Sequence, residues 1–241
     1  VQSFKAYKVM ECIVLAGGLG TRLRNVIDDL PKCMAPVGNQ PFLYYTLKYL
    51  ERQNVSHIIL SLGYKYDFIL NWIDKSVWPF KISYSIEESP AGTGGAIKLS
   101  MSKSIEDCFL VINGDTYFDV SINNLFNKHL EYKADITIAL KPMKNFSRYG
   151  NVIIDGNQRI VMFQEKQNCI NGLVNGGVYL INKNSGLFEN QNHNFSFETD
   201  ILQKYYSNKN FYASINDGYF IDIGIPEDYC KADIELPKFF K

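Results

Sequence analysis

The peptide ECIVLAGGLGTRLR, residues 11–24, joins a strand-length apolar run to a loop that holds three glycines within four residues. Gly17, Gly18 and Gly20 let the backbone bend sharply and present its N–H groups to an anion such as phosphate. In a parallel α/β sheet, phosphate is bound at such a strand end. For this loop taken alone, a plain tight turn between a strand and a helix is the alternative interpretation.

The alternation of short apolar runs with amphipathic stretches continues through the first half of the chain. Strand candidates are residues 11–16, 57–62, 81–86 and 108–113, and helix candidates are residues 42–53, 66–75, 95–104 and 122–132. This pattern predicts an α/β fold with a Rossmann-like, mainly parallel central sheet flanked by helices. After residue 134, more strand candidates and one helix near 197–206 predict an additional smaller β region lying over that sheet. Those later strand candidates are residues 136–140, 151–154, 159–164 and 177–181.

No linker rich in Pro, Gly or Ser separates the halves, so residues 10–241 are predicted to form a single domain. A strand begins directly after Met10, and residues 1–9 are interpreted as an extension or a cloning remnant. No repeat with a period of about 20–50 residues occurs, which excludes a trailing β-helix or solenoid.

Composition excludes several classes of protein. The 241 residues include 25 Lys and Arg against 25 Asp and Glu, so the basic field that nucleic acid requires is missing. No apolar run approaches the ~18 residues of a membrane span. The five cysteines are scattered without the spacing of a zinc site or a disulfide framework, which favours a reducing cytoplasm. Assembly into a homo-oligomer is left open.

The loops after the strand candidates form the candidate site, because ligands of an open parallel sheet bind outside the carboxyl ends of its strands. The glycine loop with Thr21 and Arg22 follows the first strand, residues 87–95 follow the third, and Asn113-Gly114-Asp115 follows the fourth. We expect these loops to converge on one crevice. The glycine loop is not a Walker loop, and Leu23 stands where a dinucleotide fingerprint requires Gly or Ala.

Two aspartates are candidate ligands for Mg²⁺. Asp115 follows an apolar run, and Asp222 lies behind another one and ahead of a Gly/Pro turn. A hard cation that holds phosphates needs only one or two carboxylates, since water and phosphate oxygens complete its octahedron. Capping of a turn is the alternative role for either aspartate alone. Their joint presence with a phosphate loop favours the metal.

These motifs resemble the signature of the sugar-1-phosphate nucleotidyltransferases over residues 10–229. The matching segments, in order, are residues 15–23 with Pro31-Lys32, GTGGA at 92–96, NGD at 113–115, YG at 149–150, EK at 165–166, NGG at 175–177, and DIG at 222–224 with PEDY at 226–229. One departure is Cys33, where the family commonly has proline after the signature lysine. Because cysteine lacks the fixed φ of proline, we expect a looser turn there.

The resemblance implies a reaction and a role for each motif. An oxygen of a sugar 1-phosphate attacks the α-phosphate of a nucleoside triphosphate and releases pyrophosphate, by positioning and charge neutralisation and without a protein nucleophile. The implied catalytic residues are Arg22, Lys32 and Lys166; the nucleotide-binding residues are Leu15, Ala16, Gly17, Gly18, Gly20, Thr21, Glu87, Gly92 and Thr93; the sugar-binding residues are Asn113, Gly150, Glu165, Asn175 and Gly176; and the Mg²⁺ ligands are Asp115 and Asp222. Taken alone, Lys166 is better explained as a surface lysine, and residues 175–177 as a hairpin turn.

Glu87 occupies the position of the family's base-reading side chain. A carboxylate accepts hydrogen bonds from both adjacent donors on the edge of guanine, whereas an amide side chain pairs better with uracil and thymine. Glu87 therefore favours GTP as the nucleotide. Glu88 is the reader if the strand register is shifted by one residue, and an exposed glutamate at a strand end is the plain alternative.

Within the family, the motifs most resemble those of bacterial guanylyltransferases that act on D-glycero-α-D-manno-heptose 1-phosphate and make GDP-heptose for capsules or surface layers. Enzymes that transfer GMP to mannose 1-phosphate, or dTMP or UMP to glucose 1-phosphate, share every catalytic motif and are the alternatives. A non-catalytic protein that binds nucleotide or sugar phosphate is the alternative of a different class. A nicotinamide-dependent dehydrogenase is excluded because the fingerprint and its acidic residue are missing.

Overall fold

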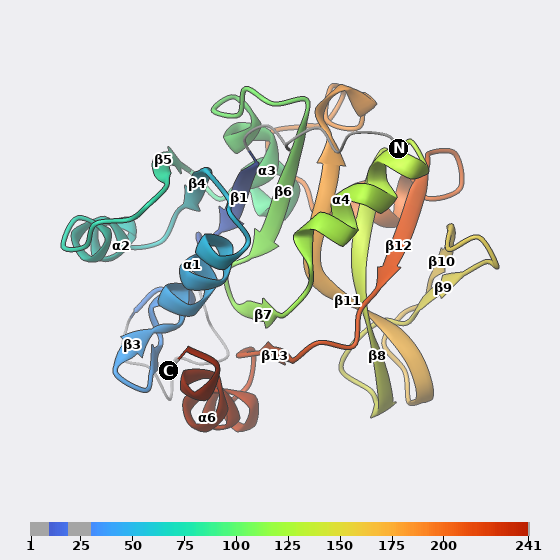
Figure 1. Cartoon of the computed structure of the whole chain (residues 1–241). Coiled ribbons are helices and arrows are strands. Elements are labelled where there is room, and N and C mark those ends of the chain that lie inside the picture. The colour runs from blue at the N-terminus through green and yellow to red at the C-terminus, as the bar shows by residue number, and fades with distance from the viewer. Residues whose placement is uncertain (1–9, 19–29, 241) are drawn as a thin grey trace, which may run out of the picture.

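The computed structural model describes residues 10–18 and 30–240 of the chain (Figure 1). Its centre is a seven-stranded sheet. In spatial order the strands are β12 (Phe211–Ile215), β8 (Ile136–Phe146), β11 (Cys169–Asn182), β6 (Cys108–Asn113), β1 (Glu11–Leu15), β4 (His57–Leu62) and β5 (Lys81–Ile86). Among the described strands of this sheet, only β11 runs antiparallel to its neighbours. The predicted Rossmann-like, mainly parallel sheet is confirmed.

Four helices form at the four helix candidates of the first half. They are α1 (Phe42–Arg52), α2 (Tyr66–Ile73), α3 (Gly92–Met101) and α4 (Ile122–Glu131). Helix α3 begins at Gly92 rather than at the expected Gly95, because Gly92 takes a left-handed φ of 70° that turns the chain directly into the helix. Ser121 caps α4 by accepting the N–H of Asn124.

The later strands β8 and β11 extend the central sheet instead of lying over it, so the expectation was wrong for these two strands. β11 pairs along β6, with Val178 opposite Ile112. Residues 178–181 are buried on both faces, and their backbone groups find hydrogen-bond partners only inside a sheet. Beyond the core, β8 and β11 continue as a two-stranded arm that ends with Cys169 opposite Phe146.

Shorter elements complete the chain. The predicted hairpin exists as β9 (Val152–Ile154) paired with β10 (Ile160–Phe163). β13 (Phe220–Asp222) pairs antiparallel with β7 (Thr116–Phe118). The others are β2 (Pro36–Val37), β3 (Gln40–Pro41), α5 (Gln203–Tyr205), α6 (Pro226–Glu235), the π-helix Phe197–Leu202 and the 3-10 helices Lys32–Met34, Lys183–Ser185 and Leu236–Phe240.

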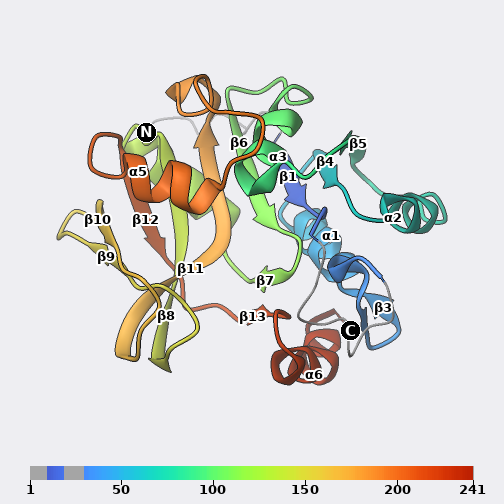
Figure 2. The same ribbon diagram turned by 180° about the vertical axis from the view of Figure 1, so that it is seen from behind.

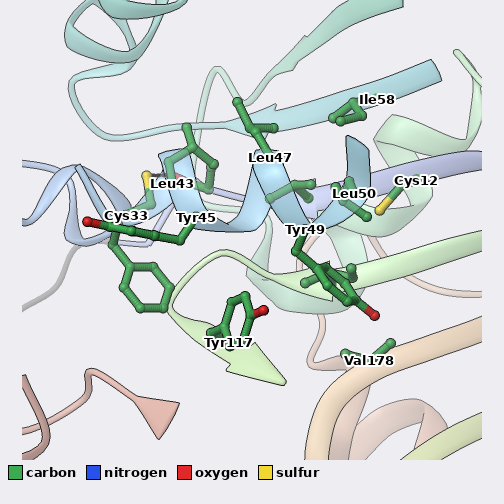
Figure 3. Packing of buried hydrophobic residues seen from close by; sticks show 14 of the residues in the cluster. Cys12, Cys33, Leu43, Tyr45, Leu47, Tyr49, Leu50, Ile58, Tyr117 and Val178 are labelled. Atoms are coloured by element: carbon green, nitrogen blue, oxygen red, sulfur yellow. Dashed lines mark hydrogen bonds between the residues drawn. The ribbon is translucent and has the colours of Figure 1, made fainter. Parts of the chain in front are cut away.

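A hydrophobic core lies on each face of the sheet, because alternate residues of a strand point to opposite faces. Val14 of β1 belongs to the core under α1, α2 and α4, and Ile13 belongs to the core under α3 and the π-helix. Figure 3 shows Leu47 and Leu50 of α1 beside Ile58 in the first core. Figure 2 shows α3 and α5 on the other face. Within the described residues, no helix is both long and apolar enough to span a membrane.

A buried polar network ties together the amino ends of β1, β4 and β5. Glu11, 1% exposed, accepts hydrogen bonds from the Ser104 hydroxyl at 2.5 Å and from the N–H groups of Ile105 and Glu106 at 2.9 and 3.0 Å. Its other oxygen lies 2.7 Å from Nδ1 of His57, whose Nε2 contacts Ser83. The network lies at the end of the sheet opposite to the carboxyl ends of these strands.

Candidate active site

A cavity of about 340 Å³ opens at the carboxyl ends of β1, β4, β5 and β6. Ten of the residues predicted from the sequence line it: Leu15, Ala16, Gly17, Gly18, Lys32, Glu87, Gly92, Thr93, Asn113 and Asp115. Three further predicted residues, Gly20, Thr21 and Arg22, lie outside the described residues. The expected convergence of strand-end loops on one crevice is therefore present in the structure.

The two described glycines of the first loop differ in their surroundings. A Cβ built on Gly17 would lie 3.1 Å from the backbone nitrogen of Gly63 and 3.2 Å from Oε1 of Glu87, so any side chain would crowd both. A Cβ on Gly18 would meet no described atom within 4 Å. Gly17 is thus required by packing between two strand ends, whereas Gly18 leaves open space beside the cavity.

Glu87 lies on the cavity wall at the end of β5. Its Oε2 accepts the N–H of Ala91 at 2.9 Å, which fixes the carboxylate. Burial raises the pKa of Glu87, and the hydrogen bond from Ala91 and the nearby charge of His193 only partly offset this effect. Glu88, the alternative base reader, is exposed and does not line the cavity.

The glycines that begin α3 receive a segment from the second half of the chain. A Cβ on Gly94 would lie 2.2 Å from the ring of Phe195, whose carbonyl accepts the N–H of Gly94 at 3.0 Å. Thr93 accepts the N–H of Phe197 at 2.9 Å and donates to Oε2 of Glu198 at 2.7 Å. The amino end of α3 is thus capped by the chain itself. Sequence reasoning missed Phe195 and Glu198, because no local motif marks them.

Lys32 connects the two predicted metal ligands. Its Nζ lies 2.6 Å from Oδ2 of Asp115 and 3.6 Å from Oδ1 of Asp222. The antiparallel pairing of β13 with β7 sets Asp222 opposite Thr116 and so brings the distant aspartate beside Asp115. Burial and the charge of Asp115 raise the pKa of Asp222, while Lys32 and Arg148 act in the opposite direction. The carboxylates of Asp115 and Asp222 therefore both lie beside the ammonium group of Lys32.

This donor set fits a Mg²⁺ ion bound together with phosphates. The structure contains, among residues 10–18 and 30–240, no cluster of three or more His, Cys, Asp or Glu side chains suited to a metal ion. Asp115 and Asp222 would supply two carboxylates, and phosphate oxygens and water would supply the remaining ligands, as is common for Mg²⁺.

Two of the predicted sugar-binding residues, Gly150 and Asn175, lie side by side, although neither lines the cavity. The isolated bridge between Asn151 and Val174 sets Gly150 beside Asn175, and a Cβ on Gly150 would lie 2.6 Å from the carbonyl oxygen of Gln164. The amide of Asn175 donates to the hydroxyl of Tyr179 at 2.8 Å. Tyr179 also interacts with Asn113, the predicted sugar-binding residue that lines the cavity, so it links Asn175 to the cavity wall.

Residues 175–177 do not form a hairpin turn, and that alternative was wrong. They lie inside β11, at a register irregularity between Asn175 and Tyr179. A Cβ on Gly176 would lie 2.3 Å from the ring of Phe118, and Gly177 has a φ of 70° beside Asn113. Close packing therefore explains both glycines, and Gly176 contributes to the site by letting β11 approach β7.

Glu165 and Lys166 are exposed and do not line the cavity. They follow β10, and Glu165 accepts a hydrogen bond from Gln203 at 3.5 Å. The structure does not bring Lys166 to the aspartates. Arg148, which sequence reasoning missed, lies there instead: it pairs with Asp228 and its charge acts on Asp222. Its position directly before Tyr149-Gly150 was the available signal.

Cys33 lies in the 3-10 helix that carries Lys32. The turn closes regularly, with the N–H of Met34 donating to Pro31 at 2.8 Å, so the expected loosening is not seen. The buried thiol contacts the carbonyl oxygen of Ala16 at 3.6 Å. Burial and the charge of Asp115 raise its pKa to about 12. The thiol therefore stays protonated and packs beneath the glycine loop.

Comparisons with known proteins agree with this geometry. Residues 11–238 match the family described as nucleotidyl transferase. The chain is 49% identical over 230 residues, 95% of its own length and 100% of the relative's, to the D-glycero-alpha-D-manno-heptose 1-phosphate guanylyltransferase of Aneurinibacillus thermoaerophilus. It is 44% identical to the protein of the same name from Campylobacter jejuni, covering 91% of this chain and 97% of the relative.

Solved structures agree as well. HddC from Yersinia pseudotuberculosis, complexed with GMP-PN, is 39% identical with a TM-score of 0.85, over 97% of this chain and 100% of that chain. A putative glucose-1-phosphate thymidylyltransferase from Bacillus anthracis, 20% identical with a TM-score of 0.78 over 93% of this chain and 94% of that chain, shares the fold. The chain belongs to the nucleotidyl transferase family.

Proposed function

We propose that this chain transfers GMP from GTP to D-glycero-α-D-manno-heptose 1-phosphate, giving GDP-heptose and pyrophosphate. The observation that carries the proposal is the identity of 49% and 44% to two guanylyltransferases named for this sugar phosphate, over nearly their whole length. The cavity supports it, because residues expected to contact a nucleoside triphosphate line one space of about 340 Å³.

Selection of guanine is assigned to Glu87. With Oε2 held by the N–H of Ala91, the carboxylate keeps acceptor capacity on both oxygens for the N1–H and N2–H₂ of guanine. Uracil and thymine would set a carbonyl oxygen against this negative charge, which costs about 1–3 kcal/mol for an unpaired buried group.

Charge neutralisation is assigned to Lys32, whose ammonium lies between the carboxylates of Asp115 and Asp222, and to Mg²⁺. When bound, this cation would lower the repulsion between the triphosphate and the incoming sugar phosphate. Asp115 and Asp222 would hold this cation, and Lys32 would then be free to contact the triphosphate. Asn113, with its amide set by Tyr179, and Asn175 would orient the sugar.

Mannose 1-phosphate is the second candidate sugar. Several relatives named mannose-1-phosphate guanylyltransferase match most of this chain, for example at 30% identity for the Mycobacterium tuberculosis protein. This chain covers only 64% of that relative's length, whereas it covers all of the Aneurinibacillus relative. The heptose is therefore the favoured substrate.

The test is release of pyrophosphate over a grid of four nucleoside triphosphates and three sugar 1-phosphates, with and without Mg²⁺. Activity is expected with GTP and Mg²⁺, and the manno-heptose is expected to exceed mannose and glucose by ten-fold or more, the effect of about one unpaired buried polar group. Equal rates with mannose would remove the heptose assignment. Release with UTP or dTTP alone would contradict the role of Glu87, and no release at all would favour a binding protein.

The cytoplasm is the compartment proposed for this reaction, with the product serving capsule or surface-layer synthesis in a bacterium. Cys12, Cys33, Cys108, Cys169 and Cys230 all carry free thiols, which supports a reducing environment.

A further inference from the structure

We infer that Arg148 binds the phosphate group of the sugar 1-phosphate and aligns it for attack, an assignment that rests on the proposed function. Arg148 lies in the turn between β8 and β9, where no regular element fixes the backbone. Its guanidinium contacts the carboxylate of Asp228 and the ring of Tyr149.

The turn Arg148-Tyr149-Gly150 connects two parts of the site directly. At one end, Gly150 lies against Gln164 and next to the bridge between Asn151 and Val174, which carries the chain to Asn175 on the sugar side. At the other end, the ring of Tyr149 packs 5.9 Å from that of Phe220, on the strand that carries Asp222. Arg148 therefore lies between the predicted sugar side and the strand that carries Asp222.

The guanidinium is oriented but only partly used. Nη1 donates to Oδ2 of Asp228 in the first turn of α6, and Cζ lies 5.4 Å from the centre of the Tyr149 ring. The side chain is 35% exposed. An arginine has five N–H donors in a rigid fork, so these contacts leave donors able to bind two phosphate oxygens.

The incoming sugar phosphate and the triphosphate are both anions, so a further cation beside them would lower their repulsion. Lys32 is assigned to the triphosphate, and Lys166 is exposed. Arg148 pairs with Asp228 in the first turn of α6, and its neighbour Tyr149 packs against Phe220 on the strand that carries Asp222. These contacts set the guanidinium beside that strand, where it can meet the incoming phosphate.

The test compares Arg148→Ala and Arg148→Lys with the unchanged protein in the GTP-dependent release of pyrophosphate. We expect the KM for the sugar 1-phosphate to rise about 10- to 100-fold in Arg148→Ala, and less in Arg148→Lys, which keeps the charge but loses the fork. The KM for GTP should stay within about two-fold, because the GTP phosphates are assigned to Lys32 and the glycine loop. Arg159→Ala, which removes an arginine bound to the carbonyl of Lys209, is the matched control and should change neither constant.

A double variant, Arg148→Ala with Asp228→Asn, distinguishes the loss of phosphate binding by Arg148 from repulsion of the phosphate by Asp228. If Arg148 contacts the phosphate, the raised KM persists in the double variant. Recovery of the original KM would mean that stranded Asp228 merely repelled the substrate, and this would overturn the inference, as would equal changes in both KM values.

A thermal-shift titration separates failure of the inference from failure of the proposed function. The unchanged protein should be stabilised by GTP and by the sugar 1-phosphate, and Arg148→Ala should lose only the second response. If the unchanged protein shows both responses without releasing pyrophosphate, the proposed function is wrong and the assignment of Arg148 falls with it. Turnover by the unchanged protein with an unaltered response in Arg148→Ala would overturn the inference alone.

Discussion

The ammonium group of Lys32 lies between carboxylates from segments far apart in the sequence. Two like charges so close favour the uptake of a proton or a cation, and the raised pKa of partly buried Asp222 is consistent with this tendency. Binding of a cation by this pair, as proposed, would come at a cost in the stability of the empty protein. This predicts opposite effects on catalysis and on folding when one charge is removed.

We expect Asp115→Asn and Asp222→Asn each to reduce Mg²⁺-dependent turnover about 100-fold or more, since each would lose a charged ligand. In Asp222→Asn, the melting temperature without Mg²⁺ should not fall, because a partly buried charge with a raised pKa is removed. The measurements are initial rates and thermal unfolding of the same preparations. Asp217→Asn, at an exposed pair with Lys141, is the control that should keep full activity. Full activity in either site variant would exclude that aspartate from metal binding.

Glu87 supports a prediction on the choice of base. Glu87→Gln should lower kcat/KM for GTP by about 1–3 kcal/mol in transition-state terms, because an amide would present a donor to the donors of guanine. UTP and dTTP should be penalised less. Glu88→Gln, at the exposed neighbour, should change none of these values. Equal losses for all nucleotides would show that Glu87 does not discriminate.

The same carboxylate predicts a pH dependence. Burial raises the pKa of Glu87, so the ionised form, to which recognition of guanine is assigned, is present above the raised pKa and is lost as the pH falls through it. We expect the preference for GTP over UTP to decline at a higher pH than an ordinary glutamate, with a pKa of about 4.3, would give. Competition assays with both nucleotides across the acid range measure this. An unchanged preference down to about pH 4 would contradict it.

At the scale of elements, the Glu11 network holds the amino ends of β1 and β4 to the loop after α3. Burial raises the pKa of Glu11, but hydrogen bonds from Ser104, Glu106, His57 and Ile105 together lower it below its ordinary value. The folded-state pKa lies below that of the unfolded chain, so the contribution to stability is present above the unfolded value and is lost as the pH falls through the folded one.

Glu11→Gln should therefore lower the free energy of unfolding by about 2–4 kcal/mol at neutral pH, because an amide NH₂ would face backbone donors in a buried place. The difference from the unchanged protein should shrink below about pH 4, where the unfolded chain binds its proton. Urea unfolding at several pH values measures both. Glu131→Gln on the exposed end of α4 is the control. A loss of unfolding free energy in Glu11→Gln that does not depend on pH would contradict the stabilising role of the Glu11 charge.

The start of α3 makes a second prediction at this scale. Alanine normally stabilises a helix relative to glycine, but a Cβ on Gly94 would lie 2.2 Å from the Phe195 ring. We expect Gly94→Ala to destabilise the fold by about 1–3 kcal/mol and to raise the KM for GTP, because displaced Phe195 moves the segment that contacts Thr93. Gly156→Ala, in a turn with no described atom within 4 Å of the added carbon, is the matched control. If Gly94→Ala were more stable than the unchanged protein, the segment around Phe195 would be able to move without lowering the free energy of unfolding.

Local pattern predicted those elements whose residues are buried continuously or periodically. β4 is buried along its whole length and was found with its observed ends. Helix α6 was not predicted, because among its residues only Ala232 is buried and the rest carry no apolar stripe. β7 and β13 have three residues each, too few for a pattern. The middle of β11 contains Gly176 and Gly177, which are typical of turns, and its extended course depends on pairing with β8 and on the packing of Gly176 against Phe118.

At the scale of the whole molecule, the candidate site combines both halves of the chain. The glycine loop, Glu87 and Asp115 come from the first half and could be predicted from strand ends. Asp222 was predicted by motif, but its approach to Asp115 depends on the pairing of β13 with β7, which no local pattern reveals. Arg148 and Glu198 were missed for the same reason, since each gains its place only through contacts with distant segments.

The register irregularity in β11 separates its two ends. Inward of it, residues 178–182 stay paired with β6 beside the cavity; outward, residues 169–175 pair with β8, and Val174 also forms a bridge to Asn151. A substitution, or a change of length, in the outer part can be absorbed at the irregularity without shifting the inner residues. If the outer part contacts the sugar, as proposed, evolution could exchange it while the residues assigned to the triphosphate are preserved. An ancestral enzyme of this kind would acquire a new sugar by mutation of one arm and keep its chemistry intact.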